Sequence, residues 1–144
     1  MKDKQLVSIL MNCYNGEKYL QEAIDSIYSQ TYSNWEVIFI DNCSTDRSAE
    51  IANSYNDGRL KYYKTEKNLP LGAARNWGMK FVNGNFLAFL DTDDVWFSNK
   101  LEKQLNVIGE DIAFVYGPVI HINEKGDALR ETKINKEKNF KSLL

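Results

Sequence analysis

The chain has few of the residues on which several common kinds of site depend. It has one histidine, His121, among 144 residues, which argues against zinc chemistry built on clustered histidines. His121 itself is expected to be a partly exposed strand residue rather than a catalyst. There are two cysteines, Cys13 and Cys43, and each is expected in a loop that follows a strand. They could lie close together in space, but an intracellular setting favours free thiols over a disulfide.

Long apolar runs and a strong charge of one sign are also missing. The first apolar run, Leu6–Met11, is too short for the core of a signal peptide or for a membrane span. A net charge of −2, from 18 basic and 20 acidic residues, argues against a surface that binds nucleic acid through its phosphates. Glycine, proline and serine are not concentrated in any linker. These absences predict a soluble, cytoplasmic protein that has no nucleic-acid partner.

The remaining composition suits one globular domain with a substantial core, since 43% of the residues are hydrophobic and 26% are charged. Apolar residues recur with helical spacing in four places, and Ser44 or Thr45 is expected to cap the second of these helices. The helical faces comprise Leu20, Ala23, Ile24, Ile27 and Tyr28; Ala49, Ile51, Ala52 and Tyr55; Ala74, Trp77, Gly78, Phe81 and Val82; and Leu101, Leu105 and Ile108. Short apolar runs predict strands at Leu6–Met11, Trp35–Ile40, Leu60–Tyr63, Phe86–Leu90 and Ile112–Tyr116.

Strands that alternate with amphipathic helices predict an α/β fold, with a mainly parallel sheet and helices on both faces. Ligands of such sheets bind beyond the carboxyl ends of the strands. Three polar loops are expected at that edge, namely Asn12–Gly16, Asp41–Asp46 and Asp91–Asp94. Their convergence predicts a binding site.

The last of these loops places three carboxylates within four positions at the end of an apolar strand. In an extended segment Asp91 and Asp93 would point to one side while Thr92 faces away, so the two acids could address one ligand. Carboxylate oxygens suit hard divalent ions such as Mg²⁺ or Mn²⁺, which also bind phosphates. A metal-bound diphosphate is therefore the expected guest. The alternative is that Asp94 or Thr92 caps the next helix and the other acids are solvated.

Two common phosphate-binding signatures are absent. No Gly-x-Gly-x-x-Gly follows the first strand, and there is no Gly-Lys-Ser/Thr loop, so classical NAD and ATP sites are disfavoured. What remains is an acid and amides after the second strand, an aromatic at Tyr14 and the acidic loop. Together these could hold a base, a ribose and a diphosphate.

Five separated motifs resemble those of family 2 glycosyltransferases, in the same order along the chain. The resemblance runs from about Val7 to beyond Tyr116 and implies the GT-A fold, a Rossmann-like sheet flanked by helices, with a nucleotide-sugar donor. The motifs are Val7-Ser8-Ile9-Leu10 with Cys13-Tyr14-Asn15; Ser29-Gln30-Thr31-Tyr32; Asp41-Asn42-Cys43-Ser44-Thr45-Asp46; Gly72-Ala73-Ala74-Arg75-Asn76; and Leu90-Asp91-Thr92-Asp93-Asp94.

The resemblance implies roles for the loop after the first strand and for the one after the second. Asn12 belongs to the donor-binding loop, and Tyr14 would pack against the base, although an ordinary loop aromatic is the alternative. Asp41 and Asn42 would read base and ribose. Asp46 is better read as a first-turn acid favoured by the helix dipole.

The resemblance also implies roles near the acidic loop. Asp91 would lie by the ribose or the metal, and Asp93 would be the direct ligand of Mn²⁺ or Mg²⁺. Arg75, near the start of its helix, would approach the donor, with an ordinary surface ion pair as the alternative.

Two features depart from the family pattern. The family commonly has a second acid where this chain has Asn42, whose amide both accepts and donates, so UDP is favoured but the base stays open. Family members also continue well past this length, and their acceptor half supplies a carboxylate general base. Glu131 and Glu137 are expected to be solvated, so the base is expected beyond Leu144. We therefore expect residues 1–144 to be one GT-A domain, incomplete at its C-terminus, with a charged tail at 133–144.

The expected activity is inverting, metal-dependent sugar transfer from a nucleotide donor to a saccharide or lipid-linked saccharide, in cell-surface polysaccharide synthesis. The full-length protein would then associate peripherally with the inner face of the membrane. One alternative is a fragment that binds the donor without catalysis. Another is a haloacid dehalogenase-like phosphatase, with Asp91 as nucleophile and Asp93 as acid/base, but that motif usually lies on the first strand.

Overall fold

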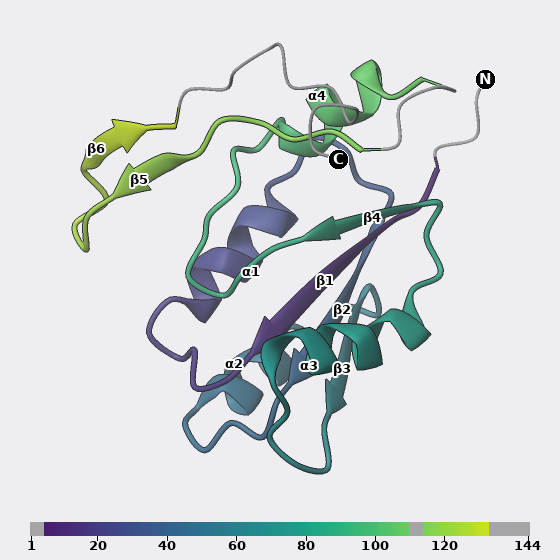
Figure 1. Ribbon diagram of the computed structural model, residues 1–144, viewed down its shortest axis with the longest axis vertical. Coiled ribbons are helices and arrows are strands. Elements are labelled where there is room, and N and C mark those ends of the chain that lie inside the picture. The colour runs from purple at the N-terminus through teal and green to yellow at the C-terminus, as the bar shows by residue number, and fades with distance from the viewer. Residues whose placement is uncertain (1–4, 110–113, 133–144) are drawn as a thin grey trace, which may run out of the picture. The chain divides into compact units, whose positions relative to one another are not determined.

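The structure is a computed structural model that describes residues 5–109 and 114–132. The chain divides into two compact units, residues 1–103 and 104–144, which are described separately. The first unit is built on a four-stranded sheet in the order β3-β2-β1-β4 (Figure 1). Its elements are β1 Val7–Cys13, α1 Leu20–Tyr28, β2 Trp35–Asp41, α2 Ser48–Ser54, β3 Leu60–Lys64, α3 Leu71–Gly78, the 3₁₀ helix η1 Met79–Phe81 and β4 Phe86–Phe89, followed by the start of α4 Lys100–Val107.

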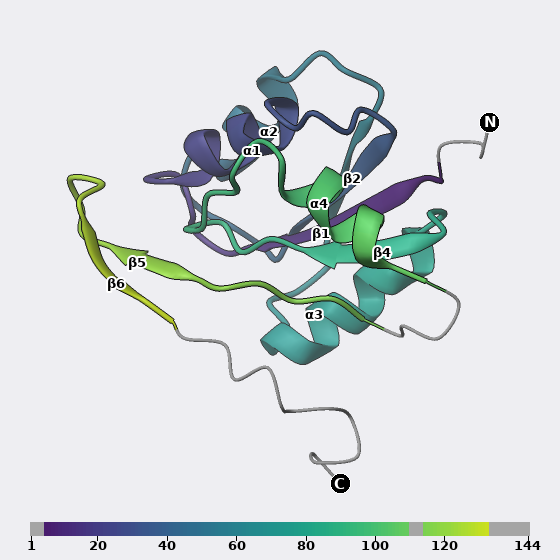
Figure 2. The ribbon, with the colours of Figure 1, turned by 90° about the horizontal axis from the view of Figure 1, so that it is seen from above.

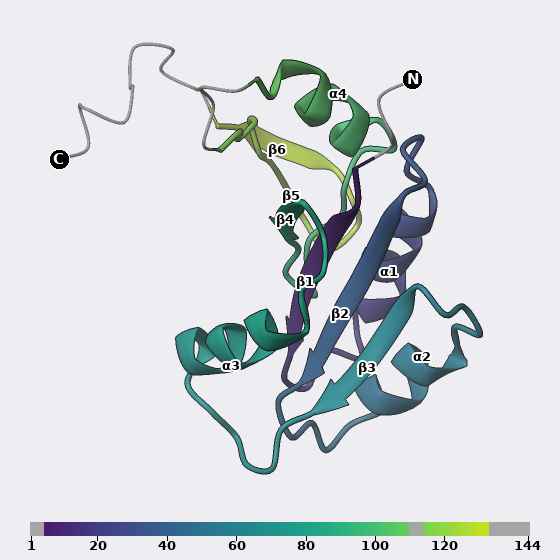
Figure 3. The same ribbon diagram turned by 90° about the vertical axis from the view of Figure 1, so that its right-hand side faces the viewer.

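All neighbouring strands of this sheet are parallel. Helices α1 and α2 cover one face and α3 covers the other, as the two turned views show (Figures 2 and 3). Strands β1 and β2 are buried along almost their whole length, which is usual for central strands covered on both faces. The predicted α/β fold is confirmed.

Close contact between α3 and the sheet depends on Gly78. A Cβ atom at this position would lie 2.7 Å from Leu10 Cδ1 and 2.9 Å from Ile40 Cγ1, so no larger residue fits without displacing the helix. Around Leu10 and Ile40 pack the rings of the α3 face, including Trp77 and Phe81. The helical spacing read from the sequence therefore marks a buried face, although α3 ends at Gly78 and continues as η1 rather than reaching Val82.

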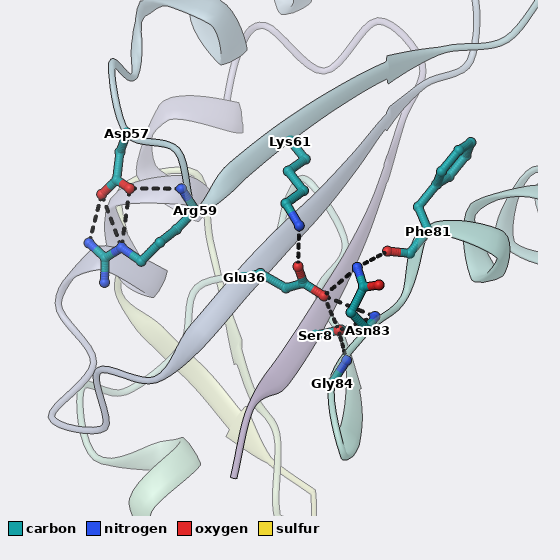
Figure 4. A network of polar contacts seen from close by, with 8 residues as sticks. All are labelled: Ser8, Glu36, Asp57, Arg59, Lys61, Phe81, Asn83 and Gly84. Atoms are coloured by element: carbon teal, nitrogen blue, oxygen red, sulfur yellow. Dashed lines mark hydrogen bonds and ion pairs between the residues drawn. The ribbon is translucent and has the colours of Figure 1, made fainter. Parts of the chain in front are cut away.

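A buried polar network ties the strands together at their amino ends (Figure 4). The carboxylate of Glu36 on β2 accepts from Ser8 Oγ on β1 at 2.6 Å and from Lys61 Nζ on β3 at 2.7 Å. It also accepts from the backbone N–H of Asn83, while the N–H of Gly84 donates to Ser8 Oγ at 2.8 Å. The turn between α3 and β4 is thereby held against three strands.

The start of α2 differs from the prediction. The helix begins at Ser48, and neither Ser44 nor Thr45 caps it. The N-cap position is Arg47, which has no side-chain cap, because the helix receives its capping carboxylates from elsewhere.

The second unit contains an antiparallel hairpin of β5 Ile120–Ile122 and β6 Ala128–Glu131, which the sequence reading missed. Of the predicted strand Ile112–Tyr116, residues 112–113 lie outside the described residues and Phe114–Tyr116 form no strand. His121 lies on β5 and is exposed, and Glu131 is exposed on β6. The predicted tail 133–144, with Glu137, also falls outside the described residues. In the described ranges, no helix is long and apolar enough to span a membrane.

Candidate functional site

The loops after β1, β2 and β4 meet at the carboxyl edge of the sheet, as predicted. The N–H of Asn42 donates to the carbonyl of Cys13 at 2.8 Å, which joins the first two loops. The loop after β4 reaches the first loop through Thr92, since a Cβ on Gly16 would lie 3.1 Å from Thr92 Oγ1. A larger residue at this position would force Thr92 or Cys13 to shift by a few tenths of an ångström.

The loops after β1 and β2 are joined by side chains as well. Ser44 Oγ accepts from the N–H of Asn15 at 3.1 Å, and Asn15 Oδ1 accepts from the N–H of Thr45 at 2.8 Å. Asn15 and Cys43 adopt left-handed backbone conformations, with φ of 53° and 63°. Such conformations cost free energy in residues other than glycine and gather at functional sites.

Two acids form a reciprocal latch between the same loops, which we call the Glu17–Asp46 latch. Asp46 Oδ2 accepts from the N–H of Glu17 at 2.9 Å, and Glu17 Oε2 accepts from the N–H of Arg47 at 2.9 Å. Asp46 Oδ1 also accepts from the N–H of Ser48, the first residue of α2. Burial alone would raise the pKa of Asp46, but hydrogen bonds from Ser48 and from the Glu17 amide lower it overall. Asp46 lies just before the first turn of α2, which begins at Ser48. The sequence did not indicate Glu17, because the N–H that its carboxylate accepts from, that of Arg47, is 30 positions away.

Asp41 is fully buried at the end of β2. Its Oδ2 accepts from the Tyr62 hydroxyl at 2.5 Å, and its Oδ1 accepts from the N–H of Ser44 at 2.7 Å. Burial, followed by the hydrogen bond to Asp41, raises the pKa of Tyr62 above its usual range. The carboxylate therefore shapes the turn into α2, and its predicted contact with a base or ribose stays a prediction.

Asn42, also buried, holds the loop between β3 and α3. Its Oδ1 accepts from the N–H of Leu69 at 2.9 Å, and its Nδ2 donates to the carbonyl of Leu69 at 2.7 Å. An aspartate could accept but not donate here, which gives a physical reason for an amide at this position. Leu69 lies two residues before α3, so Asn42 holds the chain at the approach to that helix. Its predicted contact with the base also stays a prediction.

Arg75 on α3 pairs with the acidic loop. Its Nη2 lies 2.5 Å from Asp91 Oδ1, and its guanidinium lies 5.7 Å from the centre of the Phe89 ring. Arg75 therefore forms an ion pair, with a partner that belongs to the predicted site, and its predicted approach to the donor stays a prediction. Beside the pair is an apolar cavity of about 360 Å³, lined by Gly72, Arg75, Asn76, Met79, Leu87 and Phe89.

The acidic segment is a turn rather than an extended run. The N–H of Asp94 donates to the carbonyl of Asp91 at 3.2 Å, so the alternation expected of a strand ends at Leu90. Helix α4 begins only at Lys100, so neither Thr92 nor Asp94 caps it. Asp91 and Asp93 are both exposed.

A metal would find few protein ligands here. No group of three or more His, Cys, Asp or Glu residues that could hold a metal ion occurs in the part of the chain that the structure describes. Two exposed carboxylates fit an ion such as Mg²⁺ or Mn²⁺ that takes its other ligands from phosphate and water. They do not fit a metal enclosed by protein alone.

Two further predicted residues lie at the same edge. The Tyr14 side chain is 56% exposed, so its ring is accessible to a stacking partner. The Oδ1 atom of Asn12 on β1 is buried and has no hydrogen-bond partner among the described residues. Buried oxygens are nearly always paired in folded proteins, so this atom is a candidate for a contact with a ligand or with water.

Comparison with known proteins identifies the family. The sequence profile described as Glycosyl transferase family 2 matches residues 8–143. The chain belongs to that family. Its resemblance to family 2 is therefore confirmed, and the phosphatase alternative is wrong.

The relatives of this chain include two bacterial proteins. It is 39% identical over 122 residues to the UDP-Glc:alpha-D-GlcNAc-diphosphoundecaprenol beta-1,3-glucosyltransferase WfgD of Escherichia coli, over 84% of this chain and 48% of the relative. It is 38% identical to the putative teichuronic acid biosynthesis glycosyltransferase TuaG of Bacillus subtilis, over 74% of this chain and 43% of the relative. The chain thus spans about half the length of these relatives.

Solved structures confirm the GT-A fold. The S. aureus TarS fragment 1–349 in complex with UDP-GlcNAc superposes with a TM-score of 0.67 at 33% identity, over 69% of this chain and 30% of that one. The mannosyltransferase PcManGT of Pyrobaculum calidifontis, in complex with GDP-Man and Mn²⁺, has a TM-score of 0.61 at 24% identity, over 66% of this chain and 29% of that one. This second likeness supports the fold alone.

Proposed function

We propose that the protein to which these residues belong transfers a sugar from a UDP-sugar to a hydroxyl of a saccharide or lipid-linked saccharide, with inversion and with Mn²⁺ or Mg²⁺. The observation that carries the proposal is the meeting of three loops at the carboxyl edge of a parallel sheet, where Thr92 packs against Gly16 and Asp91 pairs with Arg75. Synthesis of cell-surface polysaccharide is favoured because the names of WfgD and TuaG describe reactions of that kind. UDP is favoured over other nucleotides by the TarS complex with UDP-GlcNAc, at 33% identity.

In this proposal the acidic turn holds the metal and the diphosphate. Asp93 is the direct ligand, because it is exposed while Asp91 is already paired with Arg75. A divalent ion bound there would offset the negative charge that builds up on the diphosphate as it leaves. Asp91 contacts the ribose or the metal with the oxygen that Arg75 leaves open. The guanidinium of Arg75 adds positive charge beside the donor.

The base and ribose occupy the side of the site formed by the first two loops. Tyr14 stacks on the base, and the unpartnered Oδ1 of Asn12 accepts a hydrogen bond from the donor. Asp41 and Asn42 already form hydrogen bonds with protein groups. They contact the base and ribose only through lone pairs or protons that these bonds do not use. Their first effect on the donor is therefore to fix the shape of the turn that receives it.

The general base and the acceptor site belong, in this proposal, to a part of the protein outside residues 1–144. The relatives are about twice as long as the matched region, which leaves room for that part. Association with the inner face of a membrane would follow from a lipid-linked acceptor such as the one in the name of WfgD. For residues 1–144 alone, donor binding without transfer is the second candidate function.

Titration calorimetry tests the proposal directly. UDP is expected to bind residues 1–144 in the presence of Mn²⁺ and not in its absence, and Asp93→Ala should abolish that binding. Asp127→Ala, which removes an exposed acid on the turn between β5 and β6, outside the three loops of the site, is the matched control and should bind like the wild type. If UDP, GDP and dTDP all fail to bind the wild type with metal, the proposal is wrong. Slow hydrolysis of a UDP-sugar would favour the enzyme over the non-catalytic candidate.

A further inference from the structure

The motif Ser29-Gln30-Thr31-Tyr32 lies between α1 and β2, before the amino end of β2, and has no role in the site at the carboxyl edge. Its central side chain, Gln30, is almost fully buried. The amide Nε2 donates to the carbonyl of Phe97 at 2.8 Å and to the carbonyl of Ser26 at 3.0 Å. The amide Oε1 accepts from the N–H of Leu101 at 3.1 Å. Gln30 thus joins the end of α1 to the segment that follows the acidic turn.

Thr31 adds two contacts to the same segment. Its N–H donates to the carbonyl of Ser98 at 2.8 Å, and its hydroxyl donates to Glu102 Oε2 at 2.8 Å. The N–H of Leu101 belongs to the first turn of α4, whose amides have no partner within the helix. Gln30 therefore caps α4 from a distant part of the chain, 71 positions away.

Apolar packing holds only part of the segment between the acidic turn and α4. Val95 is 46% exposed and Phe97 is 68% exposed, whereas Trp96 is half-buried and Lys100 Nζ lies 3.8 Å from the centre of its ring. The start of the acidic turn is fixed by the N–H of Leu90, which donates to the carbonyl of Leu10 on β1 at 3.3 Å. Its exit is fixed by backbone groups of Phe97, Ser98 and Leu101 that bond to Gln30 and Thr31.

We propose that Gln30 is a positioning residue that fixes the exit of the acidic turn and so holds Asp91–Asp94 in place to bind a metal-bound nucleotide diphosphate. The consequence for ligand affinity rests on the proposed function, whereas the ordering of residues 95–101 does not. Since an ordered segment has already lost the conformational freedom that binding would otherwise remove, Gln30 raises affinity without touching the ligand.

The test substitution is Gln30→Glu. It keeps the side-chain size and an acceptor for the N–H of Leu101, but it removes both donors and places a carboxylate against the carbonyls of Phe97 and Ser26. Hydrogen exchange of the ligand-free chain should become at least tenfold faster at residues 95–101, while exchange in β1 and β2 stays unchanged. Affinity for UDP in the presence of Mn²⁺ should fall about tenfold.

Asn83→Ala is the matched control, because it removes a side-chain amide that donates to the Phe81 carbonyl and lies near Glu36, with no hydrogen bond to residues 95–101. It should lower the denaturation midpoint without changing exchange at 95–101 or affinity for UDP. If Gln30→Glu does not fold, Thr31→Val gives a milder version, since it removes only the hydroxyl contact with Glu102.

The outcomes separate the two proposals. Unchanged exchange at residues 95–101 in Gln30→Glu overturns the inference, whether or not UDP binds. Faster exchange with an affinity within twofold of the wild type also overturns it, because the turn would then be in place without Gln30. Failure of the wild type to bind any nucleotide would overturn the proposed function and the affinity consequence, while the exchange result still decides whether Gln30 orders the segment.

Discussion

Replacement of Glu36 should destabilise the chain more than any other single polar change at the amino edge of the sheet. Its side chain is 6% exposed and accepts from Ser8, Lys61 and the N–H of Asn83. Glu36→Ala leaves the Ser8 hydroxyl without its acceptor, at about 1–3 kcal/mol, and leaves the Asn83 N–H only its longer contact of 3.3 Å with Ser8 Oγ. Lys61 is 39% exposed, so water takes over much of its charge and its share is smaller.

The expected loss for Glu36→Ala is therefore about 3–5 kcal/mol, a large part of the roughly 5–15 kcal/mol that stabilises a typical domain. Glu36→Gln keeps an oxygen for Ser8 and Asn83 but loses the charge and the acceptor for Lys61, which is 39% exposed and can turn to water, so about 1–2 kcal/mol is expected. Urea denaturation at pH 7, followed by tryptophan fluorescence, measures both values. Equal losses for the two variants would show that the charge, and not the satisfied hydrogen bonds, dominates the network, and would refute this reasoning.

The pH dependence gives an independent check. Burial alone would raise the pKa of Glu36, but the hydrogen bonds from Lys61, Ser8 and Asn83 lower it overall, below the model-compound value of 4.5. The stability that Glu36 contributes is therefore fully present above about pH 4.5 and is lost as the pH falls through its lower, folded-state pKa. Between pH 6 and pH 3 the wild type should lose more stability than Glu36→Gln. Parallel pH profiles for the two proteins would contradict the assignment.

Three further predictions concern the site loops. Cys43→Gly should raise the free energy of unfolding by about 1 kcal/mol in urea denaturation, because glycine relieves the left-handed backbone at φ 63°; a loss would show that the thiol contact with Thr65 matters more. Gly16→Ala should weaken Mn²⁺-dependent UDP binding in calorimetry, since the added Cβ would lie 3.0–3.1 Å from Cys13 Sγ and Thr92 Oγ1; unchanged affinity would show that the acidic turn adjusts freely. Asn42→Asp should cost about 1–3 kcal/mol in the same denaturation assay, because a carboxylate would face the carbonyl of Leu69; no loss would mean that the loop before α3 is held by other contacts.

The fold of the first unit could be read from the sequence where burial follows a strict period. Helix α1 has the bounds that its apolar spacing indicates, and β1, β2 and β4 lie within two residues of their apolar runs. Packing of one face against a sheet enforces this period, so a local pattern carries the information. The start of α2 could not be read in this way, because Glu17, from another loop, supplies a capping carboxylate.

The candidate site, too, was predictable only where local sequence or strand order carries the information. Parallel topology brings the three loops together, so their convergence was predictable from strand order alone. The partners of Asn42 and Gln30 lie 27 and 71 positions away, and no local pattern in the sequence connects them. The hairpin of β5 and β6 did leave a signal, since Ile120 and Ile122 alternate around His121 before a turn at Gly126, whose φ is 83°.

The Glu17–Asp46 latch has a consequence for how sequences of this family diverge. Each carboxylate accepts from a backbone N–H, so the latch does not depend on the side chain at the receiving position. Arg47 is therefore free to change to any residue except proline, which has no N–H to donate. Loss of Glu17 removes the acceptor of the Arg47 N–H, and loss of Asp46 removes the acceptor of the N–H groups of Glu17 and Ser48. Neither loss removes the hydrogen-bond partner of the other carboxylate. We expect the two losses to add, so that neither substitution compensates for the other during evolution.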